Sequence, residues 1–330
     1  MSGRSHVCQR TAPNESLSPH SPRGAGHRHN RCRSDRPGPR QGGPRNEVGP
    51  AASDDWLAWS KSRKPNTSPF DLYAQQTGHA AFKVNPKNTQ AYAGGIDGTT
   101  LVYQLIRGNL ADRSDLRLYD LATRHLQPMP SGVNTPRWEC CASLSAGWLL
   151  FSRGHSYSRD SQLVLLRNLT TGEQRILDLL RNKNGLASAG QLNGTFAVWT
   201  KCDPYPVCRI YRYDLASAST TPLPTQAGKV VYSPSVNESG TVYYGQSNRG
   251  CGKSVKLMRQ PIAGAPEVIA KLPKGKDVDV TYAHRLPPRP PGDVVTTRVY
   301  YDIVRCRTHR WDIYSVDDTE RISPPSPPTP

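Results

Sequence analysis

Short apolar segments that end in an aromatic residue recur along the chain at a nearly constant spacing. The final aromatic residues of these segments are Trp59, Tyr103, Phe151, Trp199, Tyr244 and Tyr301. Successive members lie 44, 48, 48, 45 and 57 residues apart. Short apolar runs rich in aromatic and β-branched residues, bounded by polar turns, are typical of strands. The pattern therefore predicts six copies of one structural unit.

A second apolar segment follows each aromatic-ended one after a polar loop. The second segments are Phe70–Tyr73, Leu116–Leu121, Leu163–Leu166, Ile210–Tyr213, Val255–Met258 and Trp311–Tyr314. Dipeptides that favour tight turns precede many of the first segments, namely Asp97-Gly98, Ala146-Gly147, Asn193-Gly194, Ser239-Gly240 and Gly292-Asp293. Each unit is therefore predicted to be a set of antiparallel strands joined by hairpins.

A unit of about four short strands cannot bury both of its faces alone, whereas radial stacking buries them against neighbours. The 280 residues from 51 to 330 are enough for six such units. The predicted fold class is therefore all-β, a six-bladed β-propeller over residues 53–322. Its many tyrosines and tryptophans are expected to pack between blades. Only residues 174–180 show a spacing that would suit a helical turn.

The first unit lacks an obvious innermost strand, because Arg45 to Ser53 is polar and interrupted by Gly and Pro. Two arrangements are open: the C-terminal segment closes the ring, or the first blade is short. The tail at 323–330 is mostly Pro and Ser, so it is expected to donate little to a sheet.

Several turn and strand residues resemble the TolB-type, WD40-like propeller repeat. Ser233-Pro234 with Gly240 and Tyr243-Tyr244 matches the first half of that repeat, and Asp71–Tyr73 and Asp312–Tyr314 match the second. Ala142–Ser145 departs from the expected Ser-Pro turn. The resemblance covers residues 53–320. It implies a six-bladed, extracytoplasmic propeller of the periplasm or cell surface that binds other proteins.

Four of the eight cysteines suggest disulfides. Cys202 and Cys208 bracket a short hairpin loop, where two strand ends approach to bridging distance. Cys251 and Cys306 occupy the equivalent loop in the next two units and are a second candidate pair. Free thiols in a reducing cytosol remain the alternative, while the C-x5-C spacing suits zinc poorly. A bridge would imply an oxidising compartment.

Cys140 and Cys141 are adjacent in a predicted strand, so their side chains are expected to point to opposite faces.

The sequence Gly252-Lys253-Ser254 superficially resembles a phosphate-binding loop, but Ser247 stands where its first glycine is required. Alternation at Val255 and Leu257 favours a strand after the loop rather than a helix. We therefore expect a hairpin loop here and no bound nucleotide.

The first 52 residues contain nine Arg, no Lys and no apolar run longer than two, and are predicted to be a disordered arm. They contain no signal-peptide core, and Arg without Lys favours an incorrect start over a genuine basic arm. No stretch reaches the roughly eighteen apolar residues of a membrane helix. The formal charge is +17, of which the first fifty residues supply +6 and residues 51–330 supply +11.

These observations favour a non-enzymatic envelope scaffold that engages a protein or an anionic polymer through rim loops or a central funnel. The basic residues are scattered, so specific nucleic-acid recognition is not expected. The alternative is a lactonase- or sugar-dehydrogenase-type propeller with a metal site in its channel, for which Glu139, Asn85 and His284 are the candidates. No catalytic residue, cofactor or metal is assigned, and the chain is expected to be a monomer.

Overall fold

The computed structural model describes residues 46–64, 67–107, 114–154, 161–182, 184–248, 254–287, 294–306 and 310–321. In these ranges the backbone forms strands and turns and contains no helix. The predicted arm up to residue 45 and the tail from residue 322 lie outside them.

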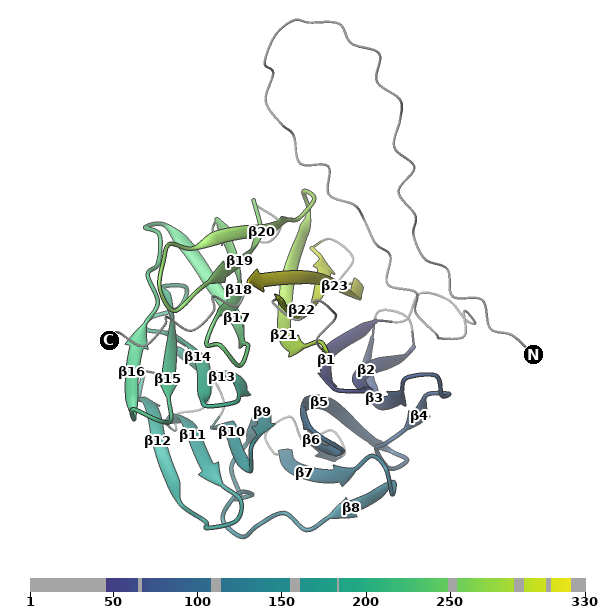
Figure 1. Ribbon diagram of the computed structural model, residues 1–330. Coiled ribbons are helices and arrows are strands. Elements are labelled where there is room, and N and C mark those ends of the chain that lie inside the picture. Colours follow the sequence, from purple (N-terminus) through teal and green to yellow (C-terminus); the bar gives the residue numbers. More distant parts are fainter. Residues whose placement is uncertain are drawn as a thin grey trace, which may run out of the picture. The chain divides into compact units, whose positions relative to one another are not determined.

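The strands form six antiparallel sheets, which are the blades of a propeller (Figure 1). Blade 1 holds β1 (Glu47–Ser53), β2 (Trp56–Lys64), β3 (Thr67–Gln76) and β4 (Phe82–Lys83); blade 2 holds β5 (Thr89–Asp97), β6 (Thr100–Arg107), β7 (Ser114–Asp120) and β8 (His125–Gln127). Blade 3 holds β9 (Glu139–Ser145), β10 (Trp148–Arg153), β11 (Gln162–Asn168) and β12 (Gln174–Leu180); blade 4 holds β13 (Leu186–Asn193), β14 (Phe196–Cys202), β15 (Cys208–Asp214) and β16 (Ser219–Pro222). Blade 5 holds β17 (Lys229–Val236), β18 (Val242–Asn248), β19 (Lys256–Gln260) and β20 (Glu267–Lys271), and blade 6 holds β21 (Lys276–Arg285), β22 (Val294–Arg305) and β23 (Arg310–Arg321).

The first strand of each blade lies next to the central axis, and the later strands follow outward (Figure 1). The predicted aromatic-ended segments lie within the second strands of the blades, which continue past the aromatic residue, and the predicted second segments lie in the third strands. Trp199, Tyr103, Tyr244 and Phe151 are among the most deeply buried side chains. The six-bladed, all-β prediction is therefore confirmed.

Aromatic pairs link neighbouring strands within several blades. Trp59 stacks on Tyr73, Trp199 on Tyr211 and Tyr301 on Tyr314, with ring centroids 6.2, 5.4 and 6.1 Å apart. Each pair joins directly opposed residues of the second and third strands. Cross-strand aromatic pairs stabilise a sheet and hold its register. The repeated aromatic residue thus has the packing role expected for it.

Two local predictions were wrong. Residues 174–180 form strand β12 rather than a helical turn, since they pair along β11 at the outer edge of blade 3. The first blade does have an inner strand, because β1 pairs with β2 despite its Gly49-Pro50 interruption. Blade 1 therefore begins before residue 53, and it is the last blade that has three strands in the described residues.

The first and last blades do not share a strand in the described part of the chain. Side chains join them instead. The buried carboxylate of Asp302 on β22 accepts a hydrogen bond of 3.0 Å from the Gly49 backbone N–H. Ser60, at the equivalent place in blade 1, accepts a bond of 3.0 Å from the Ala93 N–H of blade 2. In both cases a side chain on the second strand of one blade accepts a hydrogen bond from the inner strand of the next blade. Between the last and the first blade, where the ring closes, the acceptor is the Asp302 carboxylate instead of a serine hydroxyl.

Replacing Asp302 should therefore weaken ring closure. We expect Asp302→Ala to lower the free energy of unfolding by about 1.5–3 kcal/mol, the range for a hydrogen bond to a charged group. Ser60→Ala is the matched control and should cost about 1 kcal/mol, because its acceptor is neutral. Urea unfolding followed by tryptophan fluorescence measures both. Equal losses in the two variants would contradict a special role for Asp302.

Every inner strand carries a register irregularity near its middle, where it pairs with the second strand. These shifts lie between Val48 and Ala51, Ala93 and Gly95, Ala189 and Leu192, Tyr232 and Ser235, and Val278 and Thr281, and in β9 opposite Leu150 to Ser152. A β-bulge re-aims side chains and increases strand twist. Six bulges at one level of the ring therefore set which side chains face the axis.

Candidate functional site

A polar cavity of about 570 Å³ opens at the end of the axis where the inner strands finish. All six blades contribute to it through the last residues of their inner strands and the turns that follow. Its polar residues include Asp54, Asp97, Ser145, Asn193, Glu238 and Arg285, one from each blade in order. We call this cavity the funnel. Its volume lies in the usual range for sites that bind small molecules or side chains.

Among the buried side chains that line the funnel, those of Gln191 and Tyr282 carry polar groups. The Gln191 carboxamide, on the β13 bulge, accepts hydrogen bonds from the N–H groups of Ala283 (2.8 Å) and Val236 (3.2 Å). It also donates a bond of 2.6 Å to the Ala283 carbonyl. The Tyr282 hydroxyl accepts a long bond of 3.4 Å from Ile96 in blade 2. These contacts tie blades 4, 5 and 6 together, and blade 6 to blade 2.

The carboxylates of the funnel differ in their pairing. Glu238 forms an ion pair of 2.9 Å with Arg285, and both side chains are exposed. Within the described ranges, Asp54 and Asp97 form no ion pair. The negative charges at the funnel are therefore only partly neutralised, so its mouth favours cationic groups over anionic ones.

His284 also lines the funnel, and burial lowers the pKa of its imidazole. The nearby Asp54 and Glu238 carboxylates oppose this shift, and Arg298 adds to it. Its Nε2 atom has no hydrogen-bond partner among the described residues. His284 is consequently neutral at neutral pH and gains a charge only in acid.

The three candidates for a channel metal do not meet. Glu139 lies at the opposite end of its inner strand from the funnel and pairs with Arg153 at 2.9 Å. Asn85 follows β4, and its Oδ1 accepts a bond of 2.8 Å from the Leu72 N–H in the middle of β3. Only His284 lies in the funnel. Across the described ranges, no three His, Cys, Asp or Glu side chains are grouped as a metal site requires.

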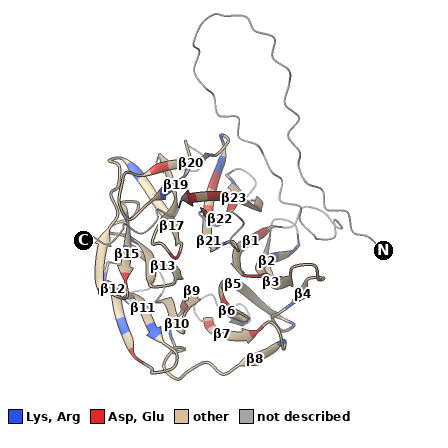
Figure 2. Cartoon of the chain, in the orientation of Figure 1, with Lys and Arg blue, Asp and Glu red and all other residues tan. Residues whose placement is uncertain are grey.

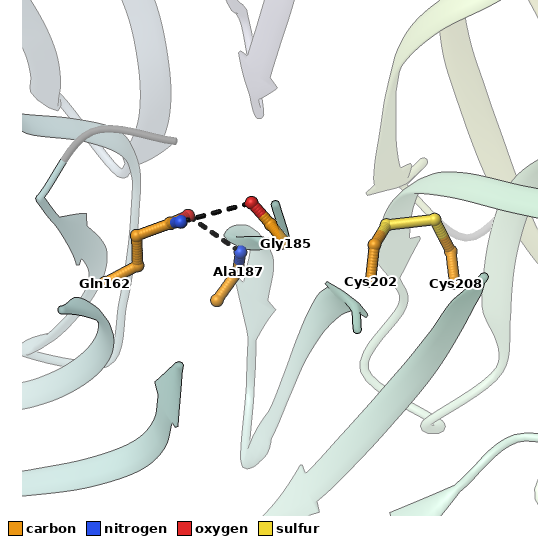
Figure 3. Close-up of a disulfide and its surroundings, with 5 residues drawn as sticks. All are labelled: Gln162, Gly185, Ala187, Cys202 and Cys208. Carbon is orange, nitrogen blue, oxygen red and sulfur yellow. Dashed lines mark hydrogen bonds between the residues drawn. A yellow bond between two sulfur atoms is a disulfide. The ribbon is translucent and has the colours of Figure 1, made fainter. Parts of the chain in front are cut away.

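Cys202 and Cys208 form a disulfide with an S–S distance of 2.03 Å (Figure 3). They end β14 and begin β15, directly opposite each other, and both are buried. The neighbouring Gln162 side chain of blade 3 contacts Gly185 and Ala187 of blade 4 at 3.2 and 3.0 Å (Figure 3). Cys306 is also disulfide-bonded. Cys251, its predicted partner, lies outside the described residues, so that pairing stays a prediction.

The sequence resembling a phosphate loop lies between β18 and β19, which pair as an antiparallel hairpin. Most of the loop itself, residues 249–253, is outside the described residues. Because strands flank it on both sides, the helix that a phosphate-binding loop requires does not follow it. The prediction of a hairpin here is confirmed.

Sequence reasoning missed most of the funnel. In the sequence, Asp97 and Asn193 stand out only as turn residues, and Asp54, Gln191 and Glu238 belong to no recognisable motif. Their equivalent positions in the repeat were the available signal, since residues that end successive inner strands must gather at one end of the axis.

The prediction that basic residues are scattered agrees with Figure 2, where both signs of charge are distributed around the ring.

No family model matches the chain, and no curated protein matches it in sequence. Among solved structures, TolB from Acinetobacter baumannii is 16% identical with a TM-score of 0.51, and the match covers 80% of this chain and 64% of TolB. An oligogalacturonate lyase in complex with manganese is 10% identical with a TM-score of 0.47, over 78% of this chain and 73% of the lyase. A puromycin-hydrolyzing peptidase of Mycobacterium tuberculosis is 12% identical with a TM-score of 0.44, over 86% of this chain and 54% of the peptidase.

The part of the chain that the structure describes has no helix long and apolar enough to cross a lipid bilayer. At 16% identity, and over less than two thirds of TolB, the similarity concerns architecture alone. The chain therefore folds as a six-bladed β-propeller similar to that of TolB.

Proposed function

We propose that this protein is a non-enzymatic binding propeller that receives a cationic segment of a partner protein in the funnel. The observation that carries the proposal is the convergence of six blade ends on one polar cavity of about 570 Å³. Asp54 and Asp97 supply negative charge there without an ion pair among the described residues. A Lys or Arg side chain entering the funnel would meet these carboxylates and, beneath them, the neutral Gln191 and Tyr282.

The expected compartment follows from the cysteines. Disulfides persist in oxidising surroundings, and Cys202–Cys208 and the bonded Cys306 support an extracytoplasmic location. The resemblance to TolB-type repeats supports the same location and a protein partner. An anionic envelope polymer bound by the basic outer surface is the competing proposal, and the experiment below separates the two.

Fluorescence anisotropy with two labelled peptides of equal length, one rich in Lys and Arg and one rich in Asp and Glu, tests the proposal. We expect the basic peptide to bind and the Asp54→Asn/Asp97→Asn double variant to weaken binding by roughly tenfold, since partly exposed charge pairs contribute about 0.2–1 kcal/mol each. Added salt should weaken binding further. Acidification should also weaken it, because protonated His284 repels a cation.

Glu173→Gln is the matched control, because its carboxylate lies exposed next to β12, at the outer edge of blade 3. This variant should bind the basic peptide as the parent does. Preferential binding of the acidic peptide, or of an acidic polysaccharide, would contradict the funnel proposal and support the polymer. Unchanged binding by the double variant would contradict it as well.

A further inference from the structure

The bulge of β9 brings the sulfur atoms of two adjacent cysteines together. Cys140 and Cys141 were expected to point to opposite faces of a regular strand, but their Sγ atoms lie 2.6 Å apart. The strand is not regular here, because Cys141 falls within the bulge and has a φ of 55°. The expectation was wrong for this reason. Both cysteines are free in the structure, at a separation well inside the contact distance of two unbonded sulfur atoms.

The backbone at Cys141 is one that glycine would adopt more easily. Gly49 lies within the corresponding bulge of β1 and has a φ of 60°. A residue other than glycine in this region costs about 1–3 kcal/mol. The chain nevertheless has a cysteine at this point, directly after another. Ser233 has the same kind of backbone in the corresponding bulge of β17, with a φ of 53°, so what distinguishes the bulge of β9 is its pair of adjacent thiols.

The two thiols differ in exposure and in acidity. Cys141 is exposed, whereas Cys140 is only partly so. A hydrogen bond from the Cys140 thiol lowers the pKa of Cys141, and Ser188 on β13 adds to this shift. The same bond and burial raise the pKa of Cys140. Because Cys141 is the more exposed of the two thiols, a reagent in solution meets it first, and Cys140 is placed to attack any disulfide that forms on it.

The other cysteines of the chain indicate that the protein is exposed to disulfides that could oxidise these two thiols. Cys202–Cys208 is closed, and Cys306 is disulfide-bonded. A chain that forms disulfides meets other disulfides in its surroundings. Cys202 and Cys208 are 1% and 4% exposed, so a reagent in solution reaches Cys141 far more easily than it reaches them.

We propose that Cys140 and Cys141 form a vicinal dithiol–disulfide site, which closes by exchange with a low-molecular-weight disulfide. The Cys141 thiolate attacks one sulfur of that disulfide, forms a mixed disulfide and releases one thiolate. Cys140 then attacks the Cys141 sulfur, which closes the ring and releases the second thiolate. The two released thiolates take up the two protons that the cysteines lose. The cysteine pair is oxidised by two electrons and the external disulfide is reduced to two thiols.

Mass spectrometry of the full-length protein tests the proposal. The protein is treated briefly with a mild reductant without denaturant, equilibrated with oxidised glutathione, and alkylated with iodoacetamide. We expect the tryptic peptide Trp138–Arg153, which contains both cysteines, to be alkylated twice before glutathione treatment. After treatment it should carry no alkyl group and have lost two hydrogens. Cys202 and Cys208 should stay unlabelled throughout.

Two variants make the test specific. Cys141→Gly should fold, because glycine suits the left-handed backbone there, and its Cys140 should stay reduced or carry one glutathione. Cys140→Ser should stop at the mixed disulfide on Cys141. Phenylarsine oxide, which binds two adjacent thiols, should bind the reduced parent roughly 10²-fold more tightly than either variant.

Either of two results of the glutathione experiment would overturn the proposal. One is that both cysteines of the parent remain open to alkylation after glutathione treatment. The other is that the parent accumulates a stable glutathione adduct, as the single-cysteine variants do. Equal affinity of the arsenical for the parent and both variants would also contradict it, since the two sulfurs would then not act together.

Discussion

Gln191→Leu should destabilise the protein by about 3 kcal/mol or more, because three backbone groups in two other blades lose their partner. The Gln191 carboxamide satisfies the N–H and C=O of Ala283 and the N–H of Val236, and it is 3% exposed. Leucine fills a similar volume but makes no hydrogen bond. Each buried polar group left without a partner costs about 1–3 kcal/mol.

Thermal and urea unfolding of this variant measure the loss. Gln174→Leu is the control, because Gln174 is exposed on β12 and its side chain accepts a bond of 3.3 Å from a surface arginine, Arg167. It should change stability by less than about 0.5 kcal/mol. A Gln191→Leu protein as stable as the control would mean that water in the funnel replaces the carboxamide, and the proposed linkage of blades would be wrong.

The architecture could be predicted because it depends on local patterns that repeat. Each blade's second strand contains a large aromatic residue at the end of its apolar segment, and the turn dipeptides that precede many of these strands mark a hairpin. Six repetitions average out the weak signal of any single strand. The funnel could not be predicted in the same way, because Asp54, Gln191 and Glu238 come together only after the ring has closed.

The errors have a common physical cause in the bulges of the inner strands. The Gly49-Pro50 pair predicts an interruption, yet β1 accommodates it where its register shifts. The period of an unbroken strand predicts Cys140 and Cys141 on opposite faces, whereas their sulfur atoms lie together. A bulge depends on how a strand pairs with its neighbours around the axis, so it cannot be predicted from the hydrophobic pattern of that strand alone.

Arg153→Ala should be the second severe variant, with a loss of about 3–5 kcal/mol at neutral pH, because it leaves a buried carboxylate unpaired. The Glu139 side chain is 0% exposed, and Arg153 bonds its Oε1 at 2.9 Å. Thr135 donates a second bond of 2.6 Å to the same oxygen. Without Arg153, the charge of Glu139 would be held by one hydroxyl in a buried site.

The loss should depend on pH in a defined direction. Burial raises the pKa of Glu139 in the folded protein, against the opposing effects of Thr135 and Arg153. The folded state thus holds the proton more tightly than the unfolded state, and stability falls as pH rises from the unfolded pKa to the folded one. Removing Arg153 raises the folded pKa further, which extends this window toward neutral pH. Acidifying Arg153→Ala should therefore restore part of its stability relative to the parent.

Urea unfolding at several pH values between neutral and mildly acidic measures this recovery. Arg298→Ala is the control for losing an arginine, since its partner Asp317 is largely exposed and the pair should contribute no more than about 1 kcal/mol. In the double variant Glu139→Gln/Arg153→Ala the pH-dependent part should disappear, because no buried carboxyl remains to titrate. If Arg153→Ala lost the same stability at every pH, the cost would come from the lost bonds between Arg153 and the Gly132 and Val133 carbonyls, and not from an unpaired buried charge on Glu139.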